Sequence, residues 1–478
     1  MRLTCAWIVS LVCAPFLLAG CGDRDNTPQV AAAIHQVLAG KPLVAAKAEA
    51  WTDVREFYNR RQNVPAWLDE EAANTEGTVH VVRTAREHGL DPADYGEQDI
   101  VKLLEMKASE DGFGKDALER ARRIAELDVR ITTALLSLGR DVALGRTSPK
   151  AIDSRWKARR TPPDFVGTLA ASMTGDVNTW LDRIRPQHPQ YAALQKALVD
   201  LRAQQQAPVP QGRSVSPDPD IERHLTQLAV NLERWRWMPD DFGSRHVIVN
   251  IPSFHLLARE SGQPVLEMRV VVGKPESKTP VFSDSMTTVV FSPYWNVPDS
   301  IVEGETAPAA ARDPGFLARN NMEILRVSKT GAEPVDPSTV DWDDPAELKQ
   351  LAFRQRPGAK NALGHVKFLF PNPYDVYLHD TPADQLFARP GRAFSHGCVR
   401  VEQPEALAKW VLKDSPEWDD AKIVEAMNAG VEKHVKLEQT IAVHIVYFTA
   451  WADDAGSVRF DPDIYGHDAT QSGNKAEL

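Results

Sequence analysis

Cys398 is the residue with the clearest chemical potential, and it stands in the run Ser395-His396-Gly397-Cys398-Val399-Arg400. The chain has four cysteines, and the other three are Cys5, Cys13 and Cys21. Cys5 and Cys13 would leave with the leader described below, and Cys21 is expected to be modified, so Cys398 has no cysteine with which to form a stabilising bridge. A lone thiol in an oxidising compartment is a liability unless it is buried or used. The position therefore predicts a nucleophile that attacks a carbonyl through its thiolate.

Two histidines could take the proton of this thiol. His379 lies nineteen residues before Cys398, and His396 lies two residues before it. An adjacent imidazole can accept the proton and, as imidazolium, lower the thiol pKa. A third group, either a backbone carbonyl or a carboxylate, must orient that base. Gly397 allows close backbone approach and offers N–H groups to a developing oxyanion, so these residues suffice for acyl transfer through a thioester.

Two other interpretations of the same residues stay open. A single cysteine is often a buried apolar thiol with an unrelated histidine elsewhere in the chain. A zinc site could be formed by His365, His379, His396 and Cys398, because the last two would point the same way on an extended segment. Structural zinc sites favour paired cysteines at short spacing, which this chain lacks, so we predict no metal. We find no nucleotide-binding loop and expect no cofactor.

The N-terminus predicts export. Arg2 precedes an apolar run from Leu3 to Leu18, which is too short for a comfortable membrane-spanning helix and is typical of a signal peptide over residues 1–20. The small residues set against Cys21 resemble the lipobox of bacterial lipoproteins, in which this thiol is diacylated. The resemblance implies a periplasmic protein that is lipid-anchored through Cys21, and Gly22 after it favours the outer membrane.

The pattern along the chain predicts an α+β protein with a helical first half and a β-rich second half. Apolar residues recur at helical spacing from Ala117 to Leu144, whereas runs such as His246–Pro252 and His365–Phe370 are rich in β-branched and aromatic residues. Ile441–Trp451 is expected to pair with Ser457–Phe460 across a turn. The net charge of −11, with no basic stripe, argues against nucleic acid as a partner.

The predicted segments follow from these changes of pattern. They are a tether and first helix (21–50), a mostly helical scaffold domain (51–205), a proline-rich linker (206–222), a β-rich domain (223–465) with a lid-like, capping insertion at about 300–363, and a frayed tail (466–478).

His379 followed by Ser395–Arg400 resembles the signature of the L,D-transpeptidases. The resemblance extends to Val249–Pro252, to Val271–Pro275 with Lys278–Pro280, and to Trp295–Pro298, which are similar to the large, multi-domain branch found in Gram-negative bacteria. By that resemblance the β-rich domain is an L,D-transpeptidase catalytic domain.

The family pattern assigns a role to each residue of the motif. It makes Cys398 the nucleophile and His379 the proton donor and acceptor, with the backbone carbonyl of Asp380 as the group that orients it. His396 and Gly397 would shape the oxyanion hole. The remaining two motif residues would support the site, Arg400 by positioning the substrate or bracing the loop, and Ser395 as a supporting residue.

The resemblance also implies the reaction and its partners. Cys398 would attack a peptidoglycan donor tetrapeptide stem at its third residue, and the side-chain amine of an acceptor stem would resolve the thioester as a 3→3 cross-link. Carbapenem-type β-lactams would then inhibit covalently. Hydrolysis of the same thioester, as an L,D-carboxypeptidase or endopeptidase, or attachment of an envelope protein to peptidoglycan, remain alternatives. A non-catalytic cell-wall scaffolding lipoprotein is a third.

One departure from the large branch is expected. Its members commonly carry a small helical peptidoglycan-binding module between the scaffold and the catalytic domain. The linker of about fifteen residues after Gln205 is too short to fold as a module without disulfides or metal. We therefore predict that the module is absent.

Overall fold

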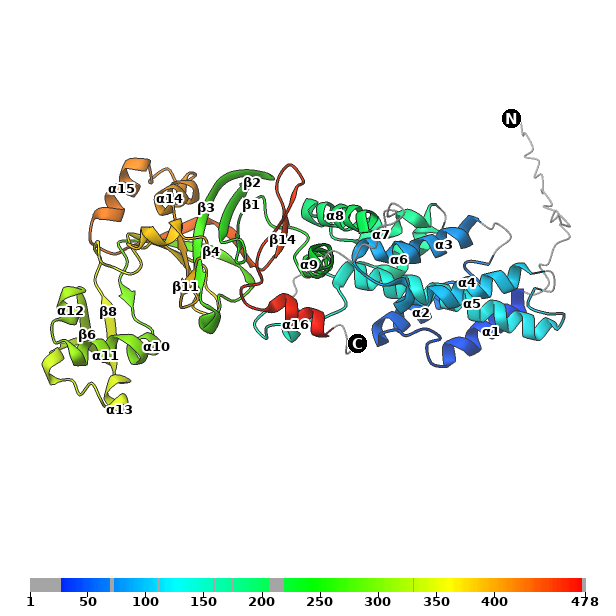
Figure 1. Ribbon diagram of the computed structural model, residues 1–478, viewed down its shortest axis with the longest axis horizontal. Helices are drawn as coiled ribbons and strands as arrows, with labels where there is room; N and C mark the ends of the chain where they lie inside the picture. The colour runs from blue at the N-terminus through cyan, green and yellow to red at the C-terminus, as the bar shows by residue number, and fades with distance from the viewer. Residues whose placement is uncertain are drawn as a thin grey trace, which may run out of the picture. The chain divides into compact units, whose positions relative to one another are not determined.

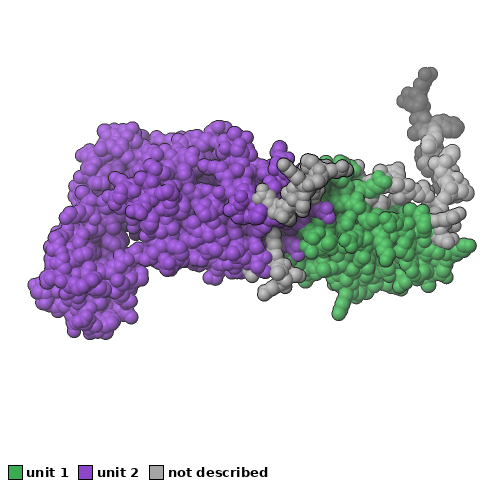
Figure 2. Space-filling model, in the orientation of Figure 1, with its two compact units in different colours: residues 1–85, 91–140, 164–183 green, residues 86–90, 141–163, 184–478 purple. Residues whose placement is uncertain are grey.

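The computed structural model describes residues 27–68, 73–109, 112–157, 160–173, 175–205, 219–329 and 331–474. The predicted signal peptide, Cys21 and most of the predicted linker lie outside these residues. The chain divides into two compact units, which Figure 2 colours separately. Unit 1 comprises residues 1–85, 91–140 and 164–183, and unit 2 comprises residues 86–90, 141–163 and 184–478. Each unit is described by itself.

Unit 1 is built from helices, which confirms the prediction for this half of the chain (Figure 1). Its principal helices are α1 (Thr27–Ala39), α2 (Ala48–Arg60), α3 (Ala73–Arg83), α4 (Glu97–Ala108), most of α5 (Ala117–Leu144) and α6 (Phe165–Ser172). The helical spacing in α5 buries Leu127, Ile131 and Leu135 on one face. Asp128 is fully buried on the same helix and accepts a hydrogen bond of 2.6 Å from the Tyr58 hydroxyl. No helix among the described residues is long and apolar enough to span a membrane.

Unit 2 contains a nine-stranded sheet in the order β11-β3-β12-β10-β9-β4-β13-β1-β2. Its strands are β1 (Arg245–Asn250), β2 (His255–Glu260), β3 (Gln263–Gly273), β4 (Phe282–Phe291), β9 (Val366–Leu369), β10 (Leu378–His379), β11 (Ala393–Ser395), β12 (Val399–Val401) and β13 (Lys433–Val446). Because β2 also pairs with β3, eight of these strands close on themselves. The β-rich second half predicted from the sequence is thereby confirmed.

Alternation along the short central strands decides which side chains point into the core and which lie on the opposite face. Leu378 on β10 and Val399 on β12 are fully buried in the core. Their neighbours His379 and Arg400 must point to the opposite face, because successive side chains of a strand alternate. In β9, Lys367 stands between the buried Val366 and Phe368 and joins that opposite face.

The segment between β4 and β9 forms a second, smaller sheet in the order β5-β8-β6-β7. Its strands are β5 (Trp295–Asn296), β6 (Met322–Ser328), β7 (Gly331–Val335) and β8 (Leu351–Gln355). The helical pieces α10 (Asp299–Ile301), α11 (Ala307–Arg312), α12 (Phe316–Arg319) and α13 (Pro345–Leu348) accompany them, with a π-helical turn η7 (Val302–Thr306) between α10 and α11. Ile324, Leu317 and Phe353 give this insertion a core of its own.

The prediction that all of Ile441–Trp451 pairs with Ser457–Phe460 is wrong. Ile441–Val446 belongs to β13, which lies between β1 and β4 in the large sheet, and only β14 (Ala450–Ala452) pairs with β15 (Val458–Phe460). Ile441, Val443 and Ile445 are each 1% exposed, so this run gains more by burial within the large sheet than an exposed hairpin would allow.

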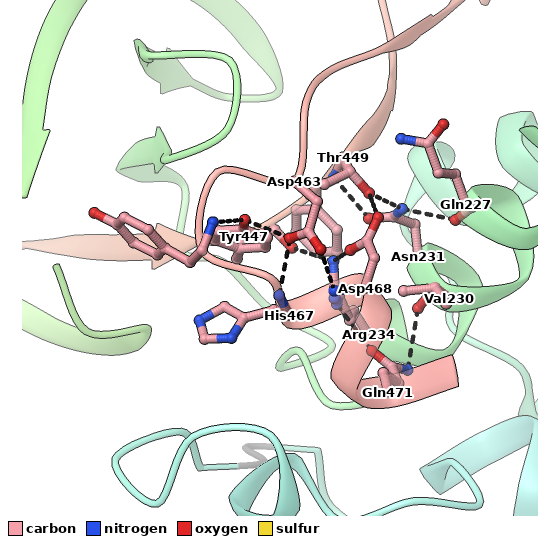
Figure 3. Close-up of polar contacts among 12 residues, drawn as sticks. Gln227, Val230, Asn231, Arg234, Tyr447, Thr449, Asp463, His467, Asp468 and Gln471 are labelled. Atoms are coloured by element: carbon pink, nitrogen blue, oxygen red, sulfur yellow. Dashed lines mark hydrogen bonds and ion pairs between the residues drawn. The ribbon is translucent and has the colours of Figure 1, made fainter. Parts of the chain in front are cut away.

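The prediction of a frayed tail from residue 466 is also wrong, because His467–Asn474 forms the helix α16. Asp468 in its first turn forms an ion pair of 2.7 Å with Arg234, a fully buried residue of α9 (Pro219–Trp235), as Figure 3 shows. An unpaired guanidinium at that depth would be costly, so the pair holds the end of the chain against α9. Since α9 begins at Pro219, residues 219–222 of the predicted linker are helical.

Candidate active site

Two adjacent parallel strands place the motif residues together. In the pairing of β10 with β12, Leu378 faces Val399 and His379 faces Arg400. The pairing continues one residue earlier, where the N–H of Val399 donates to the carbonyl of Tyr377 at 3.1 Å. Tyr377 and Cys398 therefore flank this register on the same face as His379 and Arg400. The strand pairing brings the nucleophile and base predicted from the sequence to one face of the sheet.

The imidazole of His379 is fixed by a backbone carbonyl. Its Nδ1 lies 2.5 Å from the carbonyl oxygen of Asp380, which can only accept a hydrogen bond, so Nδ1 carries the proton and Nε2 has a free lone pair. The Asp380 carboxylate accepts from the N–H groups of His365 and Thr381, each at 2.7 Å. This second pair of contacts fixes the segment whose carbonyl orients the ring.

The thiol of Cys398 lies among polar groups of the preceding loop. Its Sγ is 3.7 Å from the carbonyl oxygen of Asp375, a residue in the left-handed backbone region with φ of 53°. The side chain of Tyr377 favours the thiolate form of the same sulfur and so lowers the thiol pKa. Among the described residues no hydrogen bond joins the thiol to His379, so proton transfer requires a small movement or a substrate that closes the geometry.

Burial keeps both reacting groups neutral. It raises the pKa of the Cys398 thiol, although hydrogen bonds from Tyr377 and the charge of Arg400 offset part of the rise. Burial, with the nearby charges of Arg400 and Lys367, lowers the pKa of His379 to about 3. The expectation that an imidazolium lowers the thiol pKa is therefore wrong, since His379 is uncharged at neutral pH and the resting pair is a thiol beside a neutral base.

Ser395 ties the motif into a tight loop. Its hydroxyl donates to the carbonyl of Cys398 at 2.5 Å and accepts from the N–H of Gly397 at 3.1 Å. The Gly397 donor is thus engaged inside the loop, which corrects the expectation that it faces an oxyanion. For the N–H of Cys398 we find no acceptor among the described residues. Gly397 has a φ of 127°, a conformation that glycine adopts far more readily than other residues.

Thr279, from the segment between β3 and β4, forms hydrogen bonds that fix the same loop. Its hydroxyl donates to the carbonyl of Gly397 at 2.7 Å and accepts from the N–H of Gly273 at 2.8 Å. The N–H of Lys274 donates to the carbonyl of Ser395 at 2.9 Å. The run Lys278-Thr279-Pro280 therefore has a local physical role, which is to fix the backbone just before Cys398.

His396 makes a contact that the sequence did not predict. Its Nε2 lies 2.9 Å from Oε1 of Glu305, which belongs to the π-helical turn η7 of the insertion. His365 instead contacts the carbonyl of Met427 through Nδ1 at 2.9 Å. Across the described ranges no group of three or more histidines, cysteines or carboxylates is arranged to hold a metal ion.

Four residues of the site were missed by the sequence analysis: Asp375, Tyr377, Thr279 and Glu305. Tyr377 stands two residues before His379, so strand alternation could have placed it beside the base. Asp375 stands two residues before Tyr377 in the same segment. Thr279 and Glu305 come from segments remote in sequence, and only the folded chain brings them close to the loop of Cys398.

Two ranges of the chain match models of known protein families. Residues 244–424 match the family model of the L,D-transpeptidase catalytic domain. This chain therefore carries an L,D-transpeptidase catalytic domain. Residues 52–198 match the family model described as a scaffold domain, within the helical half of the chain.

A relative from Haemophilus influenzae, named "Putative L,D-transpeptidase", is 35% identical over 248 residues. The match covers 52% of this chain and 49% of the relative, so the chain matches about half the length of that protein.

Two solved structures align more distantly. An L,D-transpeptidase from Mycobacterium smegmatis is 12% identical, with 42% of this chain and 58% of that chain covered and a TM-score of 0.22. L,D-transpeptidase 3 from Mycobacterium tuberculosis, in complex with a faropenem-derived adduct, is 14% identical, with 42% and 60% covered and a TM-score of 0.20. Scores this low carry no argument, and the assignment rests on the family model and the relative.

The matched range of the L,D-transpeptidase domain contains the whole site described above. Cys398, His379, Thr279 and Glu305 all fall within it, and so does the insertion with its small sheet. The segment with β14, β15 and α16 lies beyond residue 424, yet it packs in the same compact unit.

Proposed function

We propose that this chain forms 3→3 cross-links between peptidoglycan stem peptides through a thioester on Cys398. The observation that carries the proposal is the shared face of His379 and Cys398 on paired strands, with Nδ1 of His379 held by the Asp380 carbonyl. That arrangement leaves Nε2 as a free base on the face that carries the thiol. A neutral base beside a neutral thiol suits a reaction in which the proton moves as the nucleophile attacks.

In the first half of the reaction, the Sγ–H proton passes to Nε2 of His379 as sulfur bonds to the carbonyl carbon of the third stem residue. The tetrahedral oxyanion accepts a hydrogen bond from the N–H of Cys398, the donor for which the described residues offer no other acceptor. The C–N bond to the terminal D-alanine then breaks. His379 returns the proton to the departing amine, which leaves a thioester and a neutral imidazole.

In the second half, the side-chain amine of an acceptor stem attacks the thioester carbonyl. His379 takes a proton from that amine, the C–S bond breaks, and the proton passes to sulfur. The products are a new amide and the original thiol. If water takes the place of the amine, the same steps give a shortened stem, which is the carboxypeptidase alternative.

Arg400 is proposed to attract the carboxylate of the donor stem. Among the described residues it forms no ion pair with a carboxylate, and its Nε is buried without a hydrogen-bond partner. Burial lowers the pKa of this guanidinium, which shows that its charge is poorly solvated. A carboxylate brought by the substrate would supply the missing partner.

Cys398→Ala is the direct test, with purified protein and defined tetrapeptide muropeptides. The wild-type chain is expected to yield 3→3 dimers and released D-alanine, and Cys398→Ala to yield neither. Mass spectrometry after exposure to imipenem is expected to show one adduct, on Cys398, since a thiolate opens the strained β-lactam carbonyl. Retention of cross-linking by Cys398→Ala would refute the proposal. Tripeptide products without dimers would favour hydrolysis, and an inert thiol would favour a non-catalytic scaffolding protein.

We also propose that Cys21 is lipidated and that the enzyme acts in the periplasm, with the outer membrane favoured. This proposal rests on the sequence around Cys21. Two acyl chains on one residue would give durable anchoring. Cys21→Ser is expected to move the protein from the membrane fraction to the soluble fraction, and unchanged membrane association would contradict it.

A further inference from the structure

Tyr465 connects the end of the chain to the loop that carries the nucleophile. Its hydroxyl donates to the carbonyl of Gly273 at 2.6 Å and accepts from the N–H of Thr279 at 3.2 Å. The Thr279 hydroxyl in turn holds the carbonyl of Gly397 at 2.7 Å. Tyr465 lies beyond the range that matches the catalytic domain, so this contact is supplied by the C-terminal segment.

The carbonyl held by Thr279 belongs to the peptide that links Gly397 to Cys398. A peptide group is planar, and in its trans form the carbonyl oxygen and the N–H point in opposite directions. The structure has no cis peptide bonds among its described residues. Holding the Gly397 carbonyl therefore fixes the direction of the Cys398 N–H, which is the proposed oxyanion donor.

Tyr465 is itself held in place from both sides. Its N–H donates to the hydroxyl of Tyr447 at 2.8 Å, and its carbonyl accepts from Nζ of Lys278 at 2.9 Å. The Tyr447 hydroxyl donates to the Asp463 carboxylate at 2.7 Å, and the Tyr447 and Tyr465 rings stack with centroids 5.6 Å apart. The position of Tyr465 is thus set by a buried cluster, with one further contact from Lys278, the residue next to Thr279.

That cluster is anchored on α9 by a buried arginine, as the close-up in Figure 3 shows. Arg234 pairs with Asp468, donates to the carbonyl of Tyr447 at 3.1 Å and reaches Gln471 at 3.1 Å. The Asp463 carboxylate also accepts from the N–H groups of His467 and Asp468, each at 2.9 Å, and so begins α16. These linked hydrogen bonds and the buried ion pair favour one conformation of the cluster.

We propose that Tyr465 is a positioning residue for catalysis, which acts through Gly273 and Thr279 to aim the Cys398 N–H at the oxyanion. This inference rests on the proposed function, because it requires an acyl-transfer step. It assigns the C-terminal segment a part in the chemistry of the L,D-transpeptidase domain in addition to its part in folding.

Two reactions of the same thiol separate this role from a structural one. Acylation by imipenem passes through an oxyanion, whereas alkylation by iodoacetamide displaces iodide and forms no oxyanion. In the full chain, Tyr465→Phe and Thr279→Val are each expected to slow acylation about tenfold, because the Cys398 N–H would no longer be held in the direction of the oxyanion. Alkylation is expected to stay within about twofold of the wild-type rate. Thr279→Ser keeps the hydroxyl and is expected to restore acylation.

The matched control is Tyr191→Phe. Tyr191 is fully buried in the same unit, and its hydroxyl lies 2.9 Å from Nδ1 of His88. Removing that hydroxyl is expected to lower thermal stability as Tyr465→Phe does, with both thiol reactions unchanged. Wild-type acylation by Tyr465→Phe and Thr279→Val would overturn the inference. A parallel fall of acylation and alkylation would also overturn it, because the loop as a whole would then have moved. A wild-type chain that imipenem does not acylate would refute the proposed function and the inference with it.

Discussion

Gly364→Ala tests whether the Asp380 carboxylate sets the position of the catalytic base. Gly364 has a φ of 60°, and a Cβ added there would lie 2.2 Å from Oδ2 of Asp380. Ordinary van der Waals contact begins at 3.4 Å, so the carboxylate must move by about 1.2 Å. That movement breaks its hydrogen bonds to the N–H groups of His365 and Thr381 and shifts the carbonyl that orients His379.

The magnitude has two parts. The left-handed conformation costs a non-glycine residue about 1–2 kcal/mol, and the overpacking adds about 1–3 kcal/mol, so we expect a loss of about 2–5 kcal/mol in the free energy of unfolding. A displacement of about 1 Å at the base is expected to slow imipenem acylation on the order of 100-fold. Urea denaturation and acylation kinetics of the purified variant measure the two effects.

Gly430→Ala is the matched control for this prediction. Gly430 has a similar φ of 67°, but a Cβ there would meet no atom within 4 Å. It should therefore lose only the conformational part, about 1–2 kcal/mol, and keep the acylation rate. If Gly364→Ala behaves like Gly430→Ala in both assays, the reasoning about Asp380 is refuted.

Three further outcomes follow from buried polar groups. Glu233→Gln should cost about 3–5 kcal/mol in the free energy of unfolding, because it removes the negative charge that lies 2.6 Å from the buried guanidinium of Arg236. Asp200→Asn, in an exposed pair, should change the free energy of unfolding by under about 0.5 kcal/mol, and equal effects of the two variants in urea denaturation would contradict this reasoning. Tyr377→Phe removes a hydroxyl that favours the Cys398 thiolate, so the thiol pKa should rise and iodoacetamide alkylation at pH 8 should slow about tenfold. An alkylation rate equal to that of the wild type at every pH would exclude this effect of Tyr377. Burial lowers the pKa of four histidines from 6.5 to between about 3 and about 4, so the unfolded chain takes up protons below pH 6.5 that the folded chain does not. Each of these histidines should therefore lower the free energy of unfolding by about 1–2 kcal/mol as the pH falls from 6.5 to 5. A free energy of unfolding that stays constant over this range would refute the conclusion that they are buried in the neutral form. These histidines are His88, His188, His379 and His467.

The fold class could be predicted because periodicity is local. Helical spacing predicted α5 with its observed bounds, Ala117–Leu144, and β-branched runs predicted the strands that flank the site. Pairing could not be read in the same way. Ile441–Val446 satisfies its hydrogen bonds between β1 and β4, which are distant in sequence, and a local reading assigned it to the nearest hairpin.

The C-terminal helix shows a second limit of local patterns. His467–Asn474 has weak helix-forming character, with a glycine and several polar residues, so the sequence indicated a frayed end. The helix forms because Asp463 accepts from its first N–H groups and Asp468 pairs with Arg234. Arg234 is remote in sequence, and no spacing rule connects it with Asp468.

For the site itself, the sequence predicted which residues would react. The count of cysteines predicted Cys398 as the nucleophile, and the resemblance of the surrounding motif added His379 as the base. Only the tertiary structure decided the protonation of these residues and the contacts that hold them in place. Burial, which depends on every neighbouring element, makes His379 a neutral base and raises the pKa of the Cys398 thiol. Thr279 contacts the loop before Cys398, and Tyr465 contacts Thr279. Residues so distant in the chain meet only when the sheet has closed.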